Sequence, residues 1–354
     1  MTGPLLITGG AGFIGTNLAD RLLSEGQRVL LFDNLSRGGV ERNLQWLQDR
    51  HGPLLDFELG DVRDADAVRA CVRRASAVFH FASQVAVTTS LVDPITDFEI
   101  NARGTLNILE ELRWSGSPAP LFFTSTNKVY GDLDDIPLRR AETRYVPTEP
   151  GILKRGVSEE RCLCFHSPYG CSKGTADQYV LDYARSFGIR STVFRMSCIY
   201  GPHQFGTEDQ GWVAHFLMRA LERAAVTLFG DGRQVRDILF VTDLVDAFLF
   251  AWHNTNAVAG RVFNIGGGPG NTISLLELLA TIRTITGETP QIEYESWRVG
   301  DQRYYVSDTS RFTAATGWRP KVAVEEGVRA LHDWLATSRE RARLAAPVLF
   351  GGAA

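Results

Sequence analysis

Three evenly spaced glycines stand directly after the first apolar run of the chain. Gly9, Gly12 and Gly15 lie between the short run at residues 5–7 and a helical pattern at residues 13–23. Glycine is needed where the backbone turns tightly, approaches a pyrophosphate, and lets a helix pack close to a strand. The free N–H groups at the start of such a helix bind phosphate oxygens. The spacing therefore predicts a dinucleotide-binding turn between a strand and a helix.

Apolar runs continue to alternate with amphipathic segments through the first 200 residues. Strands are predicted at residues 5–7, 29–32, 55–59, 77–81, 121–123 and 192–194. Helices are predicted between them at residues 13–23, 40–47, 97–113 and 169–187, with a further helical stretch that ends at Val72. This alternation predicts an α/β fold, a Rossmann-type doubly wound parallel sheet with helices on both faces.

The alternation ends shortly after residue 195, where segments become shorter and richer in Gly, Pro and aromatic residues. This change predicts a smaller C-terminal α/β substrate domain beside the dinucleotide-binding Rossmann domain. The expected division is 1–195 with 237–260 for the Rossmann domain, 196–236 with 261–340 for the substrate domain, and 341–354 for a tail.

Charge and cysteine content narrow the class of protein. A net charge of -4 argues against nucleic-acid binding. The five cysteines lack disulfide-scaffold spacing, which is typical of a reduced protein. Cys162-x-Cys164 has no second pair of matching spacing, so no metal is expected. No apolar stretch approaches the roughly 18 to 20 residues of a membrane span. We expect a cytoplasmic protein without a membrane or nucleic-acid partner.

Two acidic residues follow predicted strands at one edge of the sheet. Asp33, after the second strand, can accept hydrogen bonds from the adenosine ribose hydroxyls and would repel a 2′-phosphate. It favours NAD over NADP, although Arg37 nearby is compatible with the reverse. Asp61, after the third strand, is placed to reach the adenine amino group. The alternative for Asp61 is a helix N-cap before the segment that starts at residue 64.

A second motif carries proton-transfer chemistry. Tyr169 and Lys173 are four residues apart in a predicted helix, which places both on one face. A nearby ammonium and a positive nicotinamide ring favour the tyrosine phenolate, which can take a proton from a sugar hydroxyl. Thr126, after the fifth strand, can share that proton; a Ser/Thr turn is its alternative. His166 either assists this relay or packs as a capping histidine.

These motifs together resemble the extended short-chain dehydrogenase/reductase family of sugar-nucleotide enzymes over residues 4–338. The resemblance implies NAD as cofactor and Thr126, Tyr169 and Lys173 as catalytic residues. The implied cofactor contacts are Gly9, Gly12, Phe13, Ile14, Gly15, Asp33, Asn34, Ser36, Arg37, Asp61, Val62, Phe81, Ala82, Ser83, Gln84, Asn101, Thr124, Tyr169 and Lys173. The implied nucleotide-sugar contacts are Gln84, Thr126, Asn127, Lys128, Arg236, Arg298 and Asp301, with the arginines on the diphosphate.

The residues after Thr126 bear on the reaction. Dehydratases of this family carry an Asp-Glu pair there, because elimination of water needs an acid and a base. Asn127 cannot ionise and Lys128 is a cation, so elimination is disfavoured. The glutamate that decarboxylating members keep in this stretch is also missing. Oxidation and re-reduction of one sugar carbon remain, which amounts to epimerisation.

Longer stretches resemble epimerases that invert carbon 2 of a CDP-linked deoxyhexose through a transient 2-keto sugar. These stretches are residues 84–90, 125–132, 165–173, 204–205 and 209–213. Two alternatives stay open: a 4-epimerase of a UDP- or GDP-sugar with a 4-keto intermediate, and a non-catalytic NAD-sensing protein. The resemblance also implies a homodimer or homotetramer that packs through the helices at 97–113 and 169–187.

Overall fold

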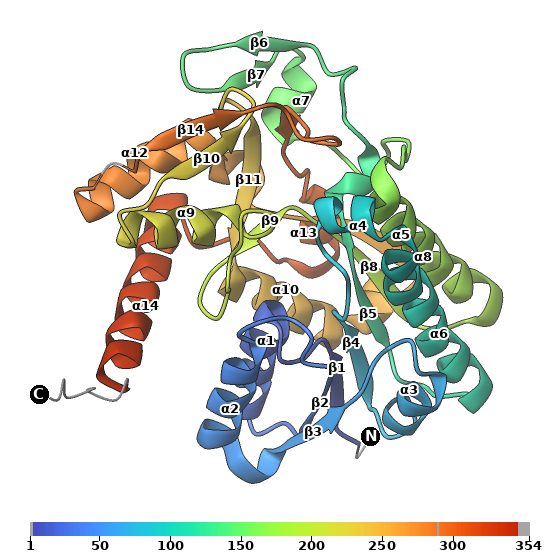
Figure 1. Cartoon of the computed structure of the whole chain (residues 1–354). Helices are drawn as coiled ribbons and strands as arrows, with labels where there is room; N and C mark the ends of the chain where they lie inside the picture. Colours follow the sequence, from blue (N-terminus) through green and yellow to red (C-terminus); the bar gives the residue numbers. More distant parts are fainter. Residues whose placement is uncertain (1–2, 289, 346–354) are drawn as a thin grey trace, which may run out of the picture.

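The computed structural model of the protein describes residues 3–288 and 290–345. Its centre is a seven-stranded parallel sheet in the order β12-β8-β5-β4-β1-β2-β3 (Figure 1). The strands are β1 (Leu5–Thr8), β2 (Val29–Asp33), β3 (Leu55–Leu59), β4 (Ala77–His80), β5 (Leu121–Thr126), β8 (Ser191–Met196) and β12 (Arg261–Ile265). The predicted doubly wound α/β architecture is confirmed.

Helices cover both faces of this sheet (Figure 1). One face carries α1 (Phe13–Ser24), α2 (Val40–His51), α10 (Val241–His253) and α13 (Ser310–Thr316). The other carries α3 (Ala65–Val72), α6 (Gly104–Ser115) and α8 (Ser167–Phe187). Strand residues alternate between the two cores, so that Leu5 and Ile7 pack toward α1 while Leu6 packs toward α6. Burial on both faces explains why the strands are continuous apolar runs.

The strand order places a crevice beside β1. The chain leaves β1 toward β2 and β3, then crosses to β4 on the other side of β1. The loops after β1 and β4 therefore diverge at the carboxyl edge of the sheet. Such a switch point is where doubly wound sheets bind ligands.

A smaller α/β part lies beyond this carboxyl edge (Figure 1). Its sheets contain β9 (Cys198–Tyr200), β10 (Val226–Phe229), β11 (Val235–Phe240), β13 (Thr272–Ser274), β14 (Ile292–Glu295) and β15 (Tyr304–Tyr305). Its helices are α9 (Trp212–Leu221), α12 (Leu275–Thr286) and α14 (Val324–Ala345). These elements share a separate apolar core around Phe216, Leu228 and Leu331.

The remaining helices and strands are short. They are η1 (Gly52–Leu54), α4 (Val87–Val92), α5 (Pro94–Phe98), η2 (Glu99–Arg103), η3 (Asn127–Tyr130), β6 (Leu138–Arg140), β7 (Tyr145–Pro147), α7 (Pro150–Arg155), α11 (Thr255–Val258) and η4 (Pro269–Asn271). Within the described ranges, no helix has the length and apolar character to cross a membrane.

Several predicted boundaries need correction. Strand β12 pairs with β8 in the Rossmann sheet, although it falls in the range 261–340 predicted for the substrate domain. Strand β11 belongs to the smaller part, so the return to the Rossmann sheet begins at α10 rather than at residue 237. The helix predicted at 97–113 is three successive segments, with η2 a π-helical turn. Helix α14 includes residues 341–345 of the predicted tail, and 346–354 lie outside the described residues.

Candidate active site

A cavity of about 600 Å³ lies between the two parts, above the crevice beside β1. The glycine turn lines one side of this cavity through Gly9, Gly12, Phe13, Ile14 and Gly15. A Cβ atom on Gly15 would lie 2.5 Å from the Gly9 oxygen, and one on Gly9 would lie 2.7 Å from the Ala82 nitrogen. Only glycine therefore fits these two positions. Helix α1 begins here without a side-chain cap, so its first N–H groups are free for a pyrophosphate.

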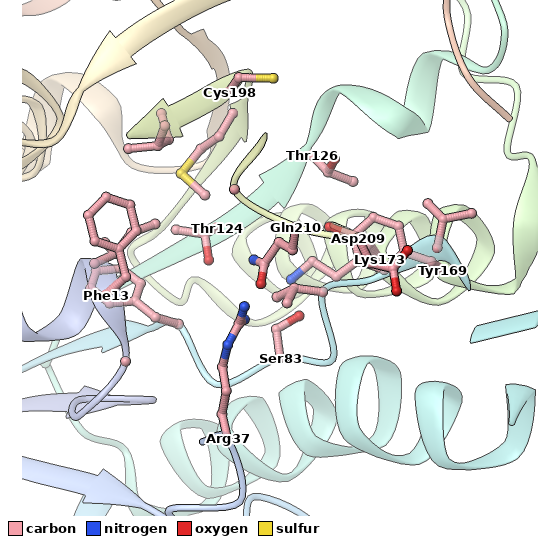
Figure 2. A pocket seen from close by; sticks show the side chains of 18 of the residues that line it. Phe13, Arg37, Ser83, Thr124, Thr126, Tyr169, Lys173, Cys198, Asp209 and Gln210 are labelled. Atoms are coloured by element: carbon pink, nitrogen blue, oxygen red, sulfur yellow. The ribbon is translucent and has the colours of Figure 1, made fainter. Parts of the chain in front are cut away.

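Asp33 joins the glycine turn to the end of β2. Its carboxylate accepts hydrogen bonds from the Ala11 nitrogen at 3.0 Å and the Leu35 nitrogen at 2.9 Å. Burial raises the pKa of Asp33, and these backbone hydrogen bonds oppose that rise. Asp33, Asn34, Ser36 and Arg37 all line the cavity. Figure 2 shows the Arg37 side chain reaching into its middle, toward Ser83.

Asp61 lies at the same end of the cavity and is an anion. The Arg63 guanidinium hydrogen-bonds both carboxylate oxygens, at 3.0 and 2.8 Å, and lowers the pKa of Asp61 to about 2. Asn34 donates a further hydrogen bond at 2.9 Å. The N-cap of α3 is Asp64 instead, which accepts from two backbone nitrogens. The capping alternative for Asp61 is therefore wrong, and its contact with adenine stays a prediction.

The opposite side of the cavity is formed by residues that lie within β5 or just after β3 and β4. Val62, Phe81, Ala82, Ser83 and Thr124 line the cavity there. These residues, with the glycine turn, give a long cleft at the switch point. Its glycine cradle, free helix N-terminus and acidic end suit a dinucleotide.

Gln84 and Asn101 do not line this cavity, although both are predicted contacts. The Gln84 amide donates to Asp97 Oδ1 and the Ala86 oxygen, and accepts from the Ala86 nitrogen. The Asn101 amide is buried and bonded to Ser83, Gln84 and Ser172. Their hydrogen-bonding groups are used inside the protein, so both residues support the cavity wall from behind.

Thr126, Tyr169 and Lys173 meet in the cavity. Figure 2 shows Tyr169 and Lys173 projecting from α8, and Thr126 from the end of β5. Burial raises the pKa of Tyr169 to about 12, while a hydrogen bond with Thr126 acts to lower it. Burial also lowers the pKa of Lys173 to about 7, against the opposing charges of Asp97 and Asp177. Burial in the protein alone therefore favours the neutral phenol of Tyr169, and the combined effect of Lys173 and a nicotinamide ring on its ionisation stays a prediction.

The charged residues among the predicted substrate contacts all line the cavity; they are Lys128, Arg236, Arg298 and Asp301. Arg236 Nη2 lies 2.7 Å from Asp301 Oδ1, and Lys128 Nζ lies 3.9 Å from the same oxygen. Two cations thus share one carboxylate, which leaves one positive charge in excess in this trio. Arg298 lies 3.6 Å from the Phe229 ring centroid and 3.1 Å from Asp209. An excess positive charge with arginine donors suits a diphosphate.

Two residues outside the motifs hold these groups in place. Gln302 is fully buried, accepts from Asn127 Nδ2 at 2.9 Å, and donates to the Gly131 oxygen at 2.6 Å. It fixes the turn that follows Thr126. Asp97, which is also fully buried, accepts a hydrogen bond from Ser172 of α8. Neither residue belongs to a recognisable motif, so the sequence gives no signal for either.

His166 pairs with residues other than Tyr169. Its Nδ1 lies 2.6 Å from Asp132 Oδ2, and its Nε2 lies 3.5 Å from the Cys164 sulfur. It is the N-cap residue of α8. These contacts favour the packing interpretation over the relay. Among the described residues, no group of three or more His, Cys, Asp or Glu side chains is arranged to hold a metal ion.

Known proteins resemble this chain in sequence and fold. The profile of the NAD dependent epimerase/dehydratase family matches residues 5–266. A CDP-paratose 2-epimerase from Salmonella typhi is 44% identical over 337 residues, which cover 93% of this chain and 98% of that protein.

Two solved structures of the same fold contain NAD. The UDP-glucose 4-epimerase of Thermus thermophilus in complex with NAD has a TM-score of 0.79 and 32% identity, covering 94% of this chain and 99% of that one. The dTDP-glucose 4,6-dehydratase of Streptomyces venezuelae with NAD bound has a TM-score of 0.81 and 26% identity, covering 96% and 98%. The chain belongs to the NAD dependent epimerase/dehydratase family, and its cofactor is NAD.

Proposed function

We propose that the protein is an epimerase that inverts carbon 2 of a CDP-linked hexose through a transient 2-keto sugar. One observation carries the proposal: the cavity holds the trio Thr126, Tyr169 and Lys173 without a carboxylate at either position after Thr126. The 44% identity to a CDP-paratose 2-epimerase supports carbon 2 and the cytidine nucleotide.

The side chains at positions 127 and 128 argue against elimination. Asn127 is buried and donates its amide to Gln302. Lys128 donates to the Gly300 oxygen at 2.7 Å and faces Asp301. Neither can act as the carboxylate acid or base that the loss of water needs. The chemistry available is removal and return of hydrogen at one carbon.

In the proposed reaction, Tyr169 takes the proton of the sugar 2-hydroxyl. NAD⁺, when bound, would supply a positive ring that favours the phenolate, and would serve as acceptor and then donor of the hydride of the C2–H bond. Thr126 hydrogen-bonds the reacting oxygen and steadies the proton, and Lys173 stabilises the phenolate. Lys128, Arg236 and Arg298 hold the diphosphate while the keto sugar presents its other face.

A 4-epimerase is the second candidate. Relatives named as UDP-glucose 4-epimerases are 30% and 32% identical over most of the chain. The same trio serves either carbon, because inversion depends only on which hydroxyl lies beside Tyr169.

Incubation with CDP-, UDP-, GDP- and TDP-hexoses, followed by NMR of the products, tests the proposal. Inversion at carbon 2 of a CDP-sugar is expected. Inversion at carbon 4 would replace it with the second candidate. Binding of NAD without turnover of any sugar would instead support the non-catalytic NAD-sensing alternative.

We also propose that the protein forms a homodimer or homotetramer. Apolar side chains are exposed on the neighbouring helices α4, α5, α6 and α8. They are Leu91, Val92, Ile95, Phe98, Trp114, Tyr179 and Phe187. An apolar surface of this kind is typical of a contact between subunits.

A further inference from the structure

Three side chains near the start of α8 contact one another in sequence, outside the cavity. Cys164 Sγ lies 3.5 Å from His166 Nε2, and His166 Nδ1 lies 2.6 Å from Asp132 Oδ2. None of these three residues lines the cavity described above. A thiol, a base beside it and a carboxylate that orients the base are the parts of an activated nucleophile.

The carboxylate determines which nitrogen of His166 carries the proton. Asp132 Oδ2 accepts a hydrogen bond, so Nδ1 is the donor and Nε2 is left as an acceptor that faces the sulfur. The other carboxylate oxygen, Oδ1, is buried and has no hydrogen-bond partner in the part of the chain that the structure describes. The side chain of Asp132 therefore serves to orient the imidazole.

The sulfur is accessible to small molecules. Cys164 is exposed, and so are Cys162, two residues earlier, and Cys171 of α8. Of these three thiols, and within the described residues, Cys164 is the one with a histidine nitrogen at hydrogen-bond distance. Exposure together with a nearby histidine is typical of reactive cysteines. The other two exposed thiols provide internal comparisons for its reactivity.

The backbone of Cys164 joins this cluster to the turn that follows Thr126. The Cys164 nitrogen donates to the Val129 oxygen of η3 at 2.9 Å. A Cβ atom on Gly131 would lie 2.6 Å from the Cys164 oxygen and 3.4 Å from its sulfur. Because the two residues are in such close contact, a group attached to the sulfur would crowd Gly131 and the turn η3 before it.

We propose that Cys164 is a modification site that forms a mixed disulfide with a low-molecular-weight disulfide. His166 Nε2 takes the thiol proton, and the Cys164 sulfur attacks one sulfur of the small disulfide. The new S–S bond forms as the old one breaks, and the leaving thiolate receives the proton from His166. Cys164 is thereby oxidised, and one half of the small disulfide is reduced to a thiol.

Adduct formation by oxidised glutathione on the NAD-bound protein tests the site without substrate. Intact-protein mass spectrometry follows the wild type, Cys164→Ser and the matched control Cys162→Ser. The wild type and the control should show a fast phase that Cys164→Ser lacks. This phase should be about tenfold or more faster than the reaction of the remaining thiols, because a base takes the proton. Equal initial rates in all three proteins would overturn the proposal.

His166→Asn tests the base. Asparagine is a favoured N-cap residue, so α8 keeps a suitable first residue, but its amide cannot take the thiol proton. The fast phase should slow by about tenfold or more. Asp132→Asn should slow it less, since the amide oxygen still accepts from Nδ1. Glu160→Gln, with an 83% exposed side chain, is the control. A wild-type rate in His166→Asn would refute the role of the imidazole, and if that variant does not fold, the Cys164→Ser comparison still decides.

The effect on the turn η3 is tested by turnover of the CDP-sugar, and this part rests on the proposed function. The mixed disulfide should lower kcat, a thiol reductant should restore it, and Cys164→Ser should be insensitive to oxidised glutathione. An adduct that leaves kcat unchanged would overturn the link between Cys164 and the turn. Absence of turnover in the untreated wild type would refute the proposed function and leave the adduct rates interpretable.

Discussion

The Tyr169 phenol is subject to opposed influences within one buried site. Burial raises the pKa of the phenol, and the hydrogen bond with Thr126 lowers it. The phenol is therefore poised to ionise when positive charge is brought beside it. At the scale of single residues, the proposed chemistry depends on this balance and on the uncharged Asn127 that follows Thr126.

Replacement of Tyr169 by Phe removes the proton acceptor and preserves the ring. We expect kcat to fall by about 10²- to 10⁴-fold. NAD binding should change little, since the glycine turn and Asp33 are untouched. Steady-state kinetics and NAD titration by fluorescence measure the two effects. Tyr294→Phe is the matched control, because Tyr294 is exposed on β14 and does not line the cavity. Near-normal turnover in Tyr169→Phe would reject the assignment.

Individual side chains were predictable where a motif names them. Thr126, Tyr169 and Lys173 line one cavity with the charged residues Lys128, Arg236, Arg298 and Asp301, and the roles of these residues stay predictions. Gln84 and Asn101 were assigned to direct contact, yet their amides are bonded within the protein. A motif marks a residue as important but does not say whether it touches the ligand or a neighbour.

At the scale of elements, the β1–α1 unit determines how closely the cofactor approaches the backbone. The turn between them brings Gly15 to within contact of Gly9 and Gly10. Any side chain there pushes α1 away from β1 and blocks the phosphate-binding N–H groups.

Gly15→Ala tests this packing. The added Cβ would lie 2.5 Å from the Gly9 oxygen and 2.7 Å from the Gly10 Cα. An overpacked contact of this kind costs about 1–3 kcal/mol. NAD affinity should therefore fall by about 10- to 100-fold. Gly151→Ala is the control, since nothing lies within 4 Å of that Cβ. Calorimetric titration with NAD measures both, and an unchanged affinity in Gly15→Ala would contradict the account.

Elements were predictable where local pattern and burial agree. The strands β1 to β5 are apolar runs between helical patterns, so the alternation predicts how many there are and where each lies along the chain. Strand β12 was assigned to the other part because only its pairing with β8, which lies far away in the sequence, makes it part of this sheet. The π-turn at Glu99–Arg103 depends on contacts of Asn101 with α8 and has no local signature.

At the scale of the whole molecule, the two parts enclose a site that neither forms alone. The Rossmann part supplies the glycine turn, Tyr169 and Lys173, and the smaller part supplies Arg236 and Arg298. The exposed apolar helices lie on the Rossmann part, on the face of α4, α5 and α8.

We expect Ile95→Glu to disrupt the proposed oligomer. Ile95 is 75% exposed on α5, and a buried glutamate in a subunit contact has no partner. Size-exclusion chromatography with light scattering should give a dimer or tetramer for the wild type and a monomer for the variant. Leu59→Glu, at the exposed end of β3, is the control. A wild-type monomer would contradict the oligomer proposal and leave the catalytic one intact.

Epimerisation of the CDP-sugar in deuterated water tests the central claim most directly. If the trio removes and returns hydrogen through NAD, the hydrogen at the inverted carbon comes from the substrate. NMR should then show the product with protium at carbon 2 and no solvent deuterium. Deuterium at that carbon would mean deprotonation by a protein base and would contradict the account.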